Sequence, residues 1–79
     1  MGYHLKPIEK GVLGEFSKIR EEFQEAEDAD LQGDSLLMFC ELADMLGAME
    51  EYLKKWNLTI EDLKKFSNKT KSAFKEGKR

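Results

Sequence analysis

Apolar residues recur at helical spacing in the first half of the chain. Five of them follow one another at intervals of four, three, four and three positions: Val12, Phe16, Ile19, Phe23 and Ala26. This spacing puts them on one face of a helix, and it predicts a helix over residues 13–30. Residues 1–12 hold the only proline of the chain, Pro7, as well as glycine, so we expect an irregular arm there.

A second helix is predicted over residues 35–56. Apolar residues cover most of its circumference, which is typical of a helix with neighbours on several sides. In the connector before it, Gly33 favours a backbone turn with positive φ, and Asp34 or Ser35 can cap the new helix. The short connector predicts that the first two helices are antiparallel.

A third helix is predicted over residues 59–76. Asn57 and Leu58 form the turn before it, and Thr59 followed by acidic residues indicates a capped helix start. We find no alternation of apolar and polar residues of the kind that marks a strand. The expected fold is therefore all-α, with two long antiparallel helices and a third, C-terminal helix.

The length of 79 residues allows one domain, whose core rarely supplies more than about 3–5 kcal/mol. A single cysteine, Cys40, excludes an internal disulfide, and a single histidine, His4, argues against zinc. Oligomerisation remains, so we expect a homodimer or a dimer of dimers that completes a four-helix-type bundle. We expect Cys40 to be a small buried packing group, Gly47 to lie where another backbone comes close, and His4 to be a surface or capping imidazole.

Charge is distributed unevenly along the chain. Residues 21–34 contain seven acidic residues and no basic one, whereas residues 68–79 contain five basic residues and a single acidic one. The formal net charge of -3 argues against nucleic-acid binding, which normally requires a strongly basic domain. No apolar stretch is long enough to span a membrane or to form a secretory signal. We therefore expect a cytoplasmic protein that binds neither nucleic acid nor membrane.

Two pairs of carboxylates have the spacing that puts both members on one side of a helix. Glu22 and Glu25 lie at the border of the first apolar stripe, and Glu41 and Asp44 interrupt the most apolar segment of the chain. Residues three positions apart on a helix are neighbours, so each pair can offer oxygen atoms to one ion. Burying unpaired carboxylates is costly unless a cation compensates. Mg²⁺ or Mn²⁺ suits a site made only of oxygen ligands.

Alternatives exist for each pair. Glu22 and Glu25 also fit a solvated acidic face, whereas Glu41 and Asp44 have no basic residue within four positions. Iron is a rival metal, but di-iron helical bundles use a Glu-x-x-His motif, and Asp44 stands where the histidine would be.

The order of these acidic motifs matches a known signature. Glu21 and Glu22 stand together, Glu25 completes an ExxE motif, and after fifteen residues Glu41 to Asp44 form an ExxD motif. This pattern resembles the all-α nucleoside triphosphate pyrophosphohydrolases of the MazG superfamily, whose signature is ExxE, a variable gap and ExxD. The flanks resemble those of short phage-type MazG-like proteins in two stretches, residues 10–15 and 69–77.

The resemblance implies cleavage of a (d)NTP between its α- and β-phosphates to give the (d)NMP and pyrophosphate. It implies that Mg²⁺ is bound by four ligands, Glu22, Glu25, Glu41 and Asp44. Glu21, together with Glu22, then has a catalytic role, as an outer ligand or as the base that orients water.

Residues further along the chain complete the expected site. Lys69 and Lys71 are candidates for binding the pyrophosphate, although basic residues near a helix C-terminus also compensate its dipole. Tyr52 and Trp56 are candidates for stacking on the base, with a place in the core or at a subunit interface as the alternative. A different kind of function also stays open, namely a non-catalytic helical adaptor that acts through a protein partner.

Overall fold

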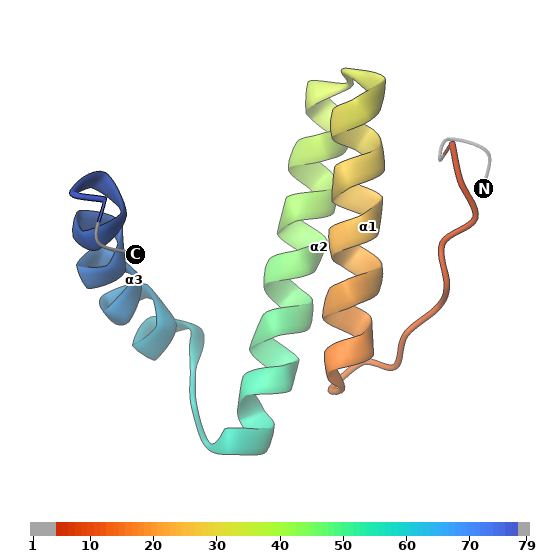
Figure 1. The fold of residues 1–79 in the computed structure, drawn as a ribbon. Coiled ribbons are helices and arrows are strands. Elements are labelled where there is room, and N and C mark those ends of the chain that lie inside the picture. Colours follow the sequence, from red (N-terminus) through yellow and green to blue (C-terminus); the bar gives the residue numbers. More distant parts are fainter. Residues whose placement is uncertain (1–4, 78–79) are drawn as a thin grey trace.

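Three α-helices make up the regular structure of the computed structural model, which describes residues 5–77. They are α1 (Phe16–Gln32), α2 (Ser35–Leu53) and α3 (Ile60–Lys75), with a 3₁₀ turn, η1 (Lys54–Trp56), after α2. Residues 5–77 contain no strand, so the all-α prediction is confirmed. None of the helices in this range is both long and apolar enough to cross a membrane. Figure 1 shows α1 and α2 as an antiparallel hairpin, with α3 to one side.

The first helix is shifted towards the C-terminus relative to the predicted range of 13–30. Gly14 has a φ of 95°, and Glu15 is extended, so α1 cannot begin before Phe16. The helix then continues to Gln32, because the left-handed residue that ends it is Gly33, with a φ of 73°. Gly33 thus performs the turn that was predicted for it.

The second helix begins at its predicted residue. Asp34 accepts a 3.0 Å hydrogen bond from the backbone N–H of Leu37, which is the expected cap. The α-helical geometry ends at Leu53, three residues before the predicted end at Trp56, because the last turn tightens into η1. Asn57 then reverses the chain in the left-handed conformation, with a φ of 61°.

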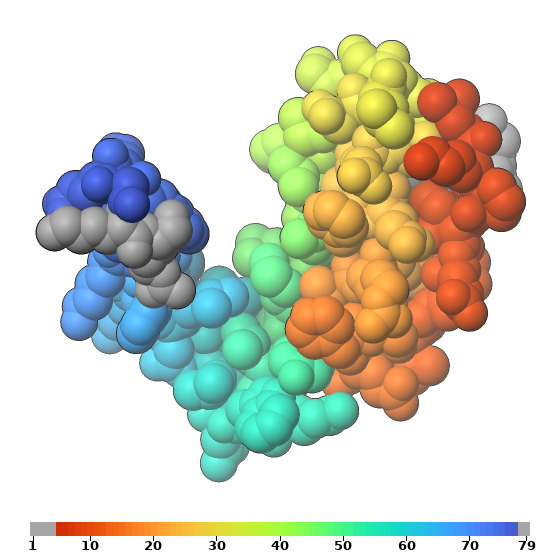
Figure 2. Space-filling view, in the orientation of Figure 1, coloured from red at the N-terminus to blue at the C-terminus, as the bar shows by residue number. Residues whose placement is uncertain are grey.

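The third helix carries a complete capping box. The side chain of Thr59 accepts a hydrogen bond from the N–H of Asp62, and the Asp62 carboxylate accepts one from the N–H of Thr59. This local arrangement stabilises α3 without help from the hairpin. Figures 1 and 2 show that a wide gap separates most of α3 from α2.

The hairpin has a small core made of small residues. The buried apolar residues of the described chain are Ala26, Ala29 and Ala48. Phe16 and Phe23, from the predicted apolar stripe of α1, are about half exposed, whereas Ala26 from the same stripe is buried together with Glu22 and Ala29. The stripe therefore forms only part of the contact between α1 and α2, through Ala26 and through the contact of the Phe16 ring with Tyr52.

Two expectations about α2 also change. Cys40 is exposed rather than buried, because α1 covers only one side of α2 and Cys40 lies on another. A Cβ atom added at Gly47 would have no neighbour within 4 Å, so no other part of the described chain approaches it closely. The expected approach of a partner subunit at Gly47 stays a prediction.

An N-terminal arm, residues 5–15, runs back along α1 (Figure 2). Its backbone donates hydrogen bonds to three side chains of α1: from Leu5 to Asp28 at 2.6 Å, from Gly11 to Glu21 at 2.8 Å and from Val12 to Ser17 at 3.0 Å. The arm has no regular structure, as expected. His4 lies outside the described residues. One side of α1 is thus covered by the arm and another by α2.

Candidate metal centre

The helical hairpin brings together carboxylates that are far apart in the sequence. One oxygen each of Glu22, Glu41 and Asp44 lies within 4.8 Å of the others. A second group, formed by Glu21, Glu22 and Glu25, meets the same criterion. Glu22 belongs to both groups, because it projects from α1 directly towards α2.

Glu25 links the two helices within this cluster. Its side chain is in hydrogen-bonding contact with Glu22 on its own helix and with Glu41 on α2. The four residues predicted as metal ligands therefore form one connected network of carboxylates, which we call the acidic cluster: Glu22, Glu25, Glu41 and Asp44.

Two members of the acidic cluster, Glu22 and Glu41, are removed from water. Glu22 is 4% exposed and Glu41 is 5% exposed, whereas Asp44 reaches the surface. Burial raises the pKa of Glu22, the charge of Glu25 raises it further, and Lys18 offsets only part of the rise. Burial also raises the pKa of Glu25, and so does its contact with Glu41. The protein thus holds these carboxyl groups where their negative charges are disfavoured.

One oxygen of the cluster stands out. Glu41 Oε2 is buried and has no hydrogen-bond partner among residues 5–77. Leaving a buried carboxylate oxygen without a donor costs free energy, so such an atom calls for a functional explanation.

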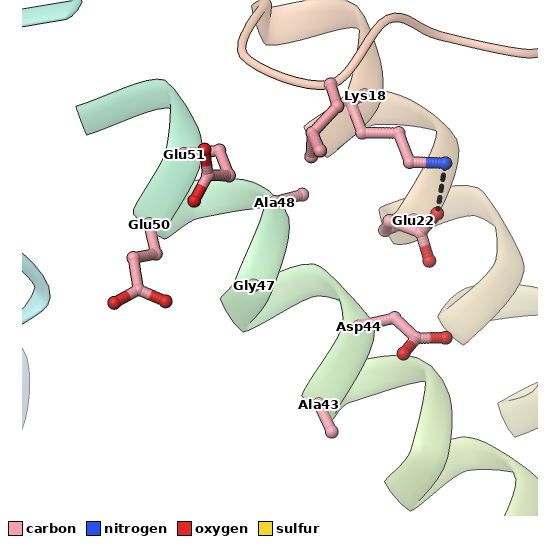
Figure 3. Close-up of a pocket in the computed structure, with 9 residues that line it drawn as sticks. Lys18, Glu22, Ala43, Asp44, Gly47, Ala48, Glu50 and Glu51 are labelled. Carbon is pink, nitrogen blue, oxygen red and sulfur yellow. Dashed lines mark ion pairs between the residues drawn. The ribbon is translucent and has the colours of Figure 1, made fainter. Parts of the chain in front are cut away.

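Lys18 is a site residue that the sequence analysis did not identify. Its Nζ lies 3.1 Å from Glu21 Oε1 and 3.2 Å from Glu22 Oε2, so a single ammonium group bridges the two adjacent glutamates. Figure 3 shows the ion pair with Glu22 at the edge of the cluster. The signal was present in the sequence, because Lys18 lies three and four positions before these residues, the spacings at which helical ion pairs form.

Glu21 faces the arm and is only 2% exposed. Its Oε1 accepts the hydrogen bond from the Gly11 N–H, and its Oε2 lies 3.6 Å from Lys10 Nζ. Burial by itself raises the pKa of Glu21, but the hydrogen bond from Gly11 and the charges of Lys18 and Lys10 outweigh it and lower the pKa. These contacts hold Glu21 as a charged anchor for the arm.

A groove of about 510 Å³ opens beside the acidic cluster. Lys18, Glu22 and Asp44 line one part of it, and Glu50 and Glu51 line another (Figure 3). Small residues of α2 form its floor: Ala43, Gly47 and Ala48. The volume is within the range of small-molecule sites. Because its lining has four carboxylates and one ammonium group, an anionic molecule needs accompanying cations to enter.

The remaining predicted site residues lie elsewhere. Lys69 and Lys71 are exposed on α3 and do not line this groove. Tyr52 makes an edge-to-face contact with Phe16, with ring centroids 5.3 Å apart, and it also contacts Trp56 at 6.5 Å. In a single chain, the structure therefore brings together the carboxylates but not the expected basic and aromatic residues.

Comparisons of the chain with known protein families, with characterised proteins and with solved structures find no match. The features of the molecule that indicate a function are therefore the acidic cluster, its buried oxygen and the adjoining groove.

Proposed function

We propose that this protein is a magnesium-dependent nucleotide pyrophosphohydrolase of the MazG-like type, which cleaves a (d)NTP to the (d)NMP and pyrophosphate. The observation that carries the proposal is the buried Glu41 Oε2, an oxygen without a donor that lies in a cluster of converging carboxylates. The order of the ExxE and ExxD motifs along the chain supports the same assignment. The groove beside the cluster offers space for the substrate.

The donor set fits magnesium, with manganese as a substitute. All the converging ligand atoms are carboxylate oxygens, which hard divalent cations prefer. Glu22, Glu41 and Asp44 would hold the ion, and Glu25 would keep Glu22 and Glu41 in position or act as a further ligand. When bound, magnesium neutralises charge on the phosphates and activates water for in-line attack.

The protein contributes orientation and exclusion of water. Burial of Glu22 and Glu41 between the helices limits their movement, so their oxygens are preorganised for a cation before it arrives. Asp44, at the open side of the cluster, faces the groove where the phosphates would lie. In this proposal Glu21 acts indirectly, because its oxygens are engaged by Gly11, Lys10 and Lys18.

The test is a panel of NTPs and dNTPs incubated with the purified protein and Mg²⁺ or Mn²⁺, with pyrophosphate release as the measurement. We expect release that depends on the metal and that is lost in Glu41→Gln. Glu27→Gln is the matched control, because Glu27 is an exposed acid on α1. Absence of pyrophosphate with every nucleotide, or full activity of Glu41→Gln, would refute the proposal.

We further propose that the protein works as a homodimer or a dimer of dimers in which helical hairpins complete a four-helix-type bundle. Three apolar residues on the side of α2 away from α1 are about half exposed or more: Phe39, Leu42 and Leu46. Their spacing of three and four places them on one face. Covering such a face is the usual way for a chain this short to gain stability.

Light scattering across micromolar concentrations tests the assembly. We expect a mass of at least two chains for the parent protein and a shift towards the monomer for Phe39→Glu. Leu58→Glu, which adds the same charge at an exposed apolar position outside this face, should keep the parent mass. A monomeric parent would contradict the assembly.

The adaptor function stays as the second candidate, because the exposed apolar residues of α2 also suit a protein partner. Thermal denaturation with and without Mg²⁺ and a non-hydrolysable nucleotide separates the two candidates. Stabilisation at millimolar ligand favours the hydrolase, whereas its absence favours the adaptor.

A further inference from the structure

Among residues 5–77, Lys18 is the only basic residue that lines the groove beside the acidic cluster. Its side chain is 28% exposed, so most of it is held between the helix surface and the two glutamates. The ammonium group is shared between two different kinds of partner. Glu21 is fixed by the arm, whereas Glu22 belongs to the cluster that we propose binds the metal.

We propose that Lys18 is the phosphate-binding residue of this site, and that it exchanges its contact with Glu22 for a phosphate group when a divalent cation occupies the acidic cluster. This inference rests on the proposed function. It assigns the role to a residue of α1 instead of the lysines of α3, Lys69 and Lys71, which do not line the groove.

The two contacts of Lys18 would respond differently to a cation. With a divalent ion bound, the Glu22 carboxylate would no longer be available to Lys18, and the ammonium group would be repelled by the added positive charge. Glu21 belongs to the second group, with Glu22 and Glu25, but not to the group formed by Glu22, Glu41 and Asp44, and its Oε1 already accepts the Gly11 N–H at 2.8 Å. Lys18 would therefore stay tethered through Glu21 at the edge of the groove, with its charge available to an anion.

The charge of the groove explains why the ammonium group of Lys18 is needed for phosphate binding. Its other charged residues are all acidic, namely Glu22, Asp44, Glu50 and Glu51, and these repel a phosphate chain. An ammonium group close to the metal ligands can contact a phosphate oxygen on the side that the metal does not reach. The arm thereby gains a role in the site, because Gly11 holds the carboxylate that holds Lys18.

Replacing Lys18 should change the affinities for Mn²⁺ and for pyrophosphate in opposite directions. In Lys18→Gln, Mn²⁺ binding followed by electron paramagnetic resonance should become several-fold tighter, because a competing cation is gone. Pyrophosphate binding measured by calorimetry at saturating Mg²⁺ should become about ten-fold weaker, the loss expected for one charged contact. Lys18→Arg should restore most of the pyrophosphate affinity, and Lys64→Gln, on exposed α3, controls for net charge.

A measurement on the parent protein removes any dependence on how the variants fold. Acetylation of lysines by a water-soluble active ester, read by mass spectrometry, should increase at Lys18 when Mg²⁺ is added and decrease again when pyrophosphate follows. Lys64 serves as the internal reference. Unchanged pyrophosphate affinity in Lys18→Gln, a parallel loss of both affinities, or no pyrophosphate protection of Lys18 would overturn the inference.

The outcomes separate this inference from the proposed function. A parent protein that neither binds Mn²⁺ nor hydrolyses any nucleotide would overturn both. A parent protein that binds Mn²⁺ and hydrolyses nucleotide, while Lys18 shows none of the expected changes, would overturn the role of Lys18 alone.

Discussion

Glu21 and Glu22 are adjacent, identical and almost equally buried, yet they lie in opposite electrostatic environments. Glu21 faces the arm, where a backbone N–H and two lysines stabilise its charge and lower its pKa, although burial alone would raise it. Glu22 faces α2, where burial and the charge of Glu25 raise its pKa and Lys18 compensates only partly.

The difference indicates two purposes for a buried carboxylate. On the arm side, the charge is satisfied by the protein itself and holds a segment in place. On the α2 side, the charges are left in excess, and Glu41 Oε2 lacks a donor within the described chain. An external cation should therefore bind most favourably on the α2 side, where the charges of the carboxylates are not compensated by the protein.

The largest effect should come from removing a charge on the α2 side. We expect Glu41→Gln to lower pyrophosphate release by more than the roughly 10- to 100-fold loss that is typical of outer-shell positions. The same variant should raise the melting temperature of the metal-free protein, because one of several repelling charges is gone. Kinetic assays and thermal scans in EDTA measure the two changes. A lower melting temperature of Glu41→Gln in EDTA would contradict the interpretation that negative charge is in excess on the α2 side.

On the arm side, removing a carboxylate should destabilise the metal-free protein. Glu21→Ala removes the acceptor of the Gly11 N–H and the partner of Lys18, and we expect a loss of about 1–3 kcal/mol in the free energy of unfolding. Urea denaturation at a fixed protein concentration measures it, and limited proteolysis should show earlier cleavage within residues 5–15. Glu27→Ala, an exposed control on the same helix, should stay within about 0.5 kcal/mol of the parent.

A double-mutant cycle should show whether the arm is energetically coupled to Glu21 or to the carboxylates on the α2 side. A Cβ atom at Gly11 would clash with the backbone carbonyl group of Ser17, so Gly11→Ala must displace the arm. Because Gly11→Ala and Glu21→Ala disrupt the same contact, their combined effect should fall short of the sum by at least about 0.5 kcal/mol.

Gly11→Ala combined with Asp44→Asn serves as the comparison cycle. Asp44 lies on α2 and makes no hydrogen bond or ion pair with the arm within residues 5–77, so these two effects should add to within about 0.5 kcal/mol. Equal coupling in both cycles would show that the two sides are not independent.

The smallest effect should appear in the pH dependence of the metal-free protein. The lowered pKa of Glu21 contributes stability that is present above its unfolded pKa of about 4.3 and is lost as the pH falls through the folded value. The raised pKa values of Glu22 and Glu25 contribute stability that is present below about 4.3 and is lost as the pH rises through the folded values.

Thermal scans from pH 3 to 8 in EDTA can separate these contributions. Glu21→Gln should flatten the acid side of the stability profile, and Glu22→Gln should flatten the decline on the neutral side. Identical profiles for the two variants would contradict the opposite pKa shifts.

Local patterns predicted much of the fold and the residues of the cluster. The caps at Asp34 and Thr59 depend on side chains that reach backbone groups three residues away, so they can be read from neighbouring positions. The same holds for the turn at Gly33. The pairing of Glu22 with Glu25 likewise needs only helical geometry.

The exposure of Phe23 and of Cys40 could not be predicted from local sequence patterns. The periodic stripe of α1 includes Phe23, but Phe23 is about half exposed, whereas its neighbour Glu22 is buried and meets the carboxylates of α2. Cys40 was predicted to be buried because it lies on a largely apolar helix, yet the exposure of a residue depends on which side of α2 has a partner.

Short-range geometry alone thus determined three capped helices and the spacing of each carboxylate pair, since these depend on residues within about four positions of one another. Tertiary structure decided that Glu41 meets Glu22 and Glu25 and that Glu21 does not share their excess of charge. The reason is that the N–H of Gly11 partly stabilises the charge of Glu21. Nearly every residue has such a backbone donor, so the sequence alone does not show which donor meets this carboxylate, and only folding decides it.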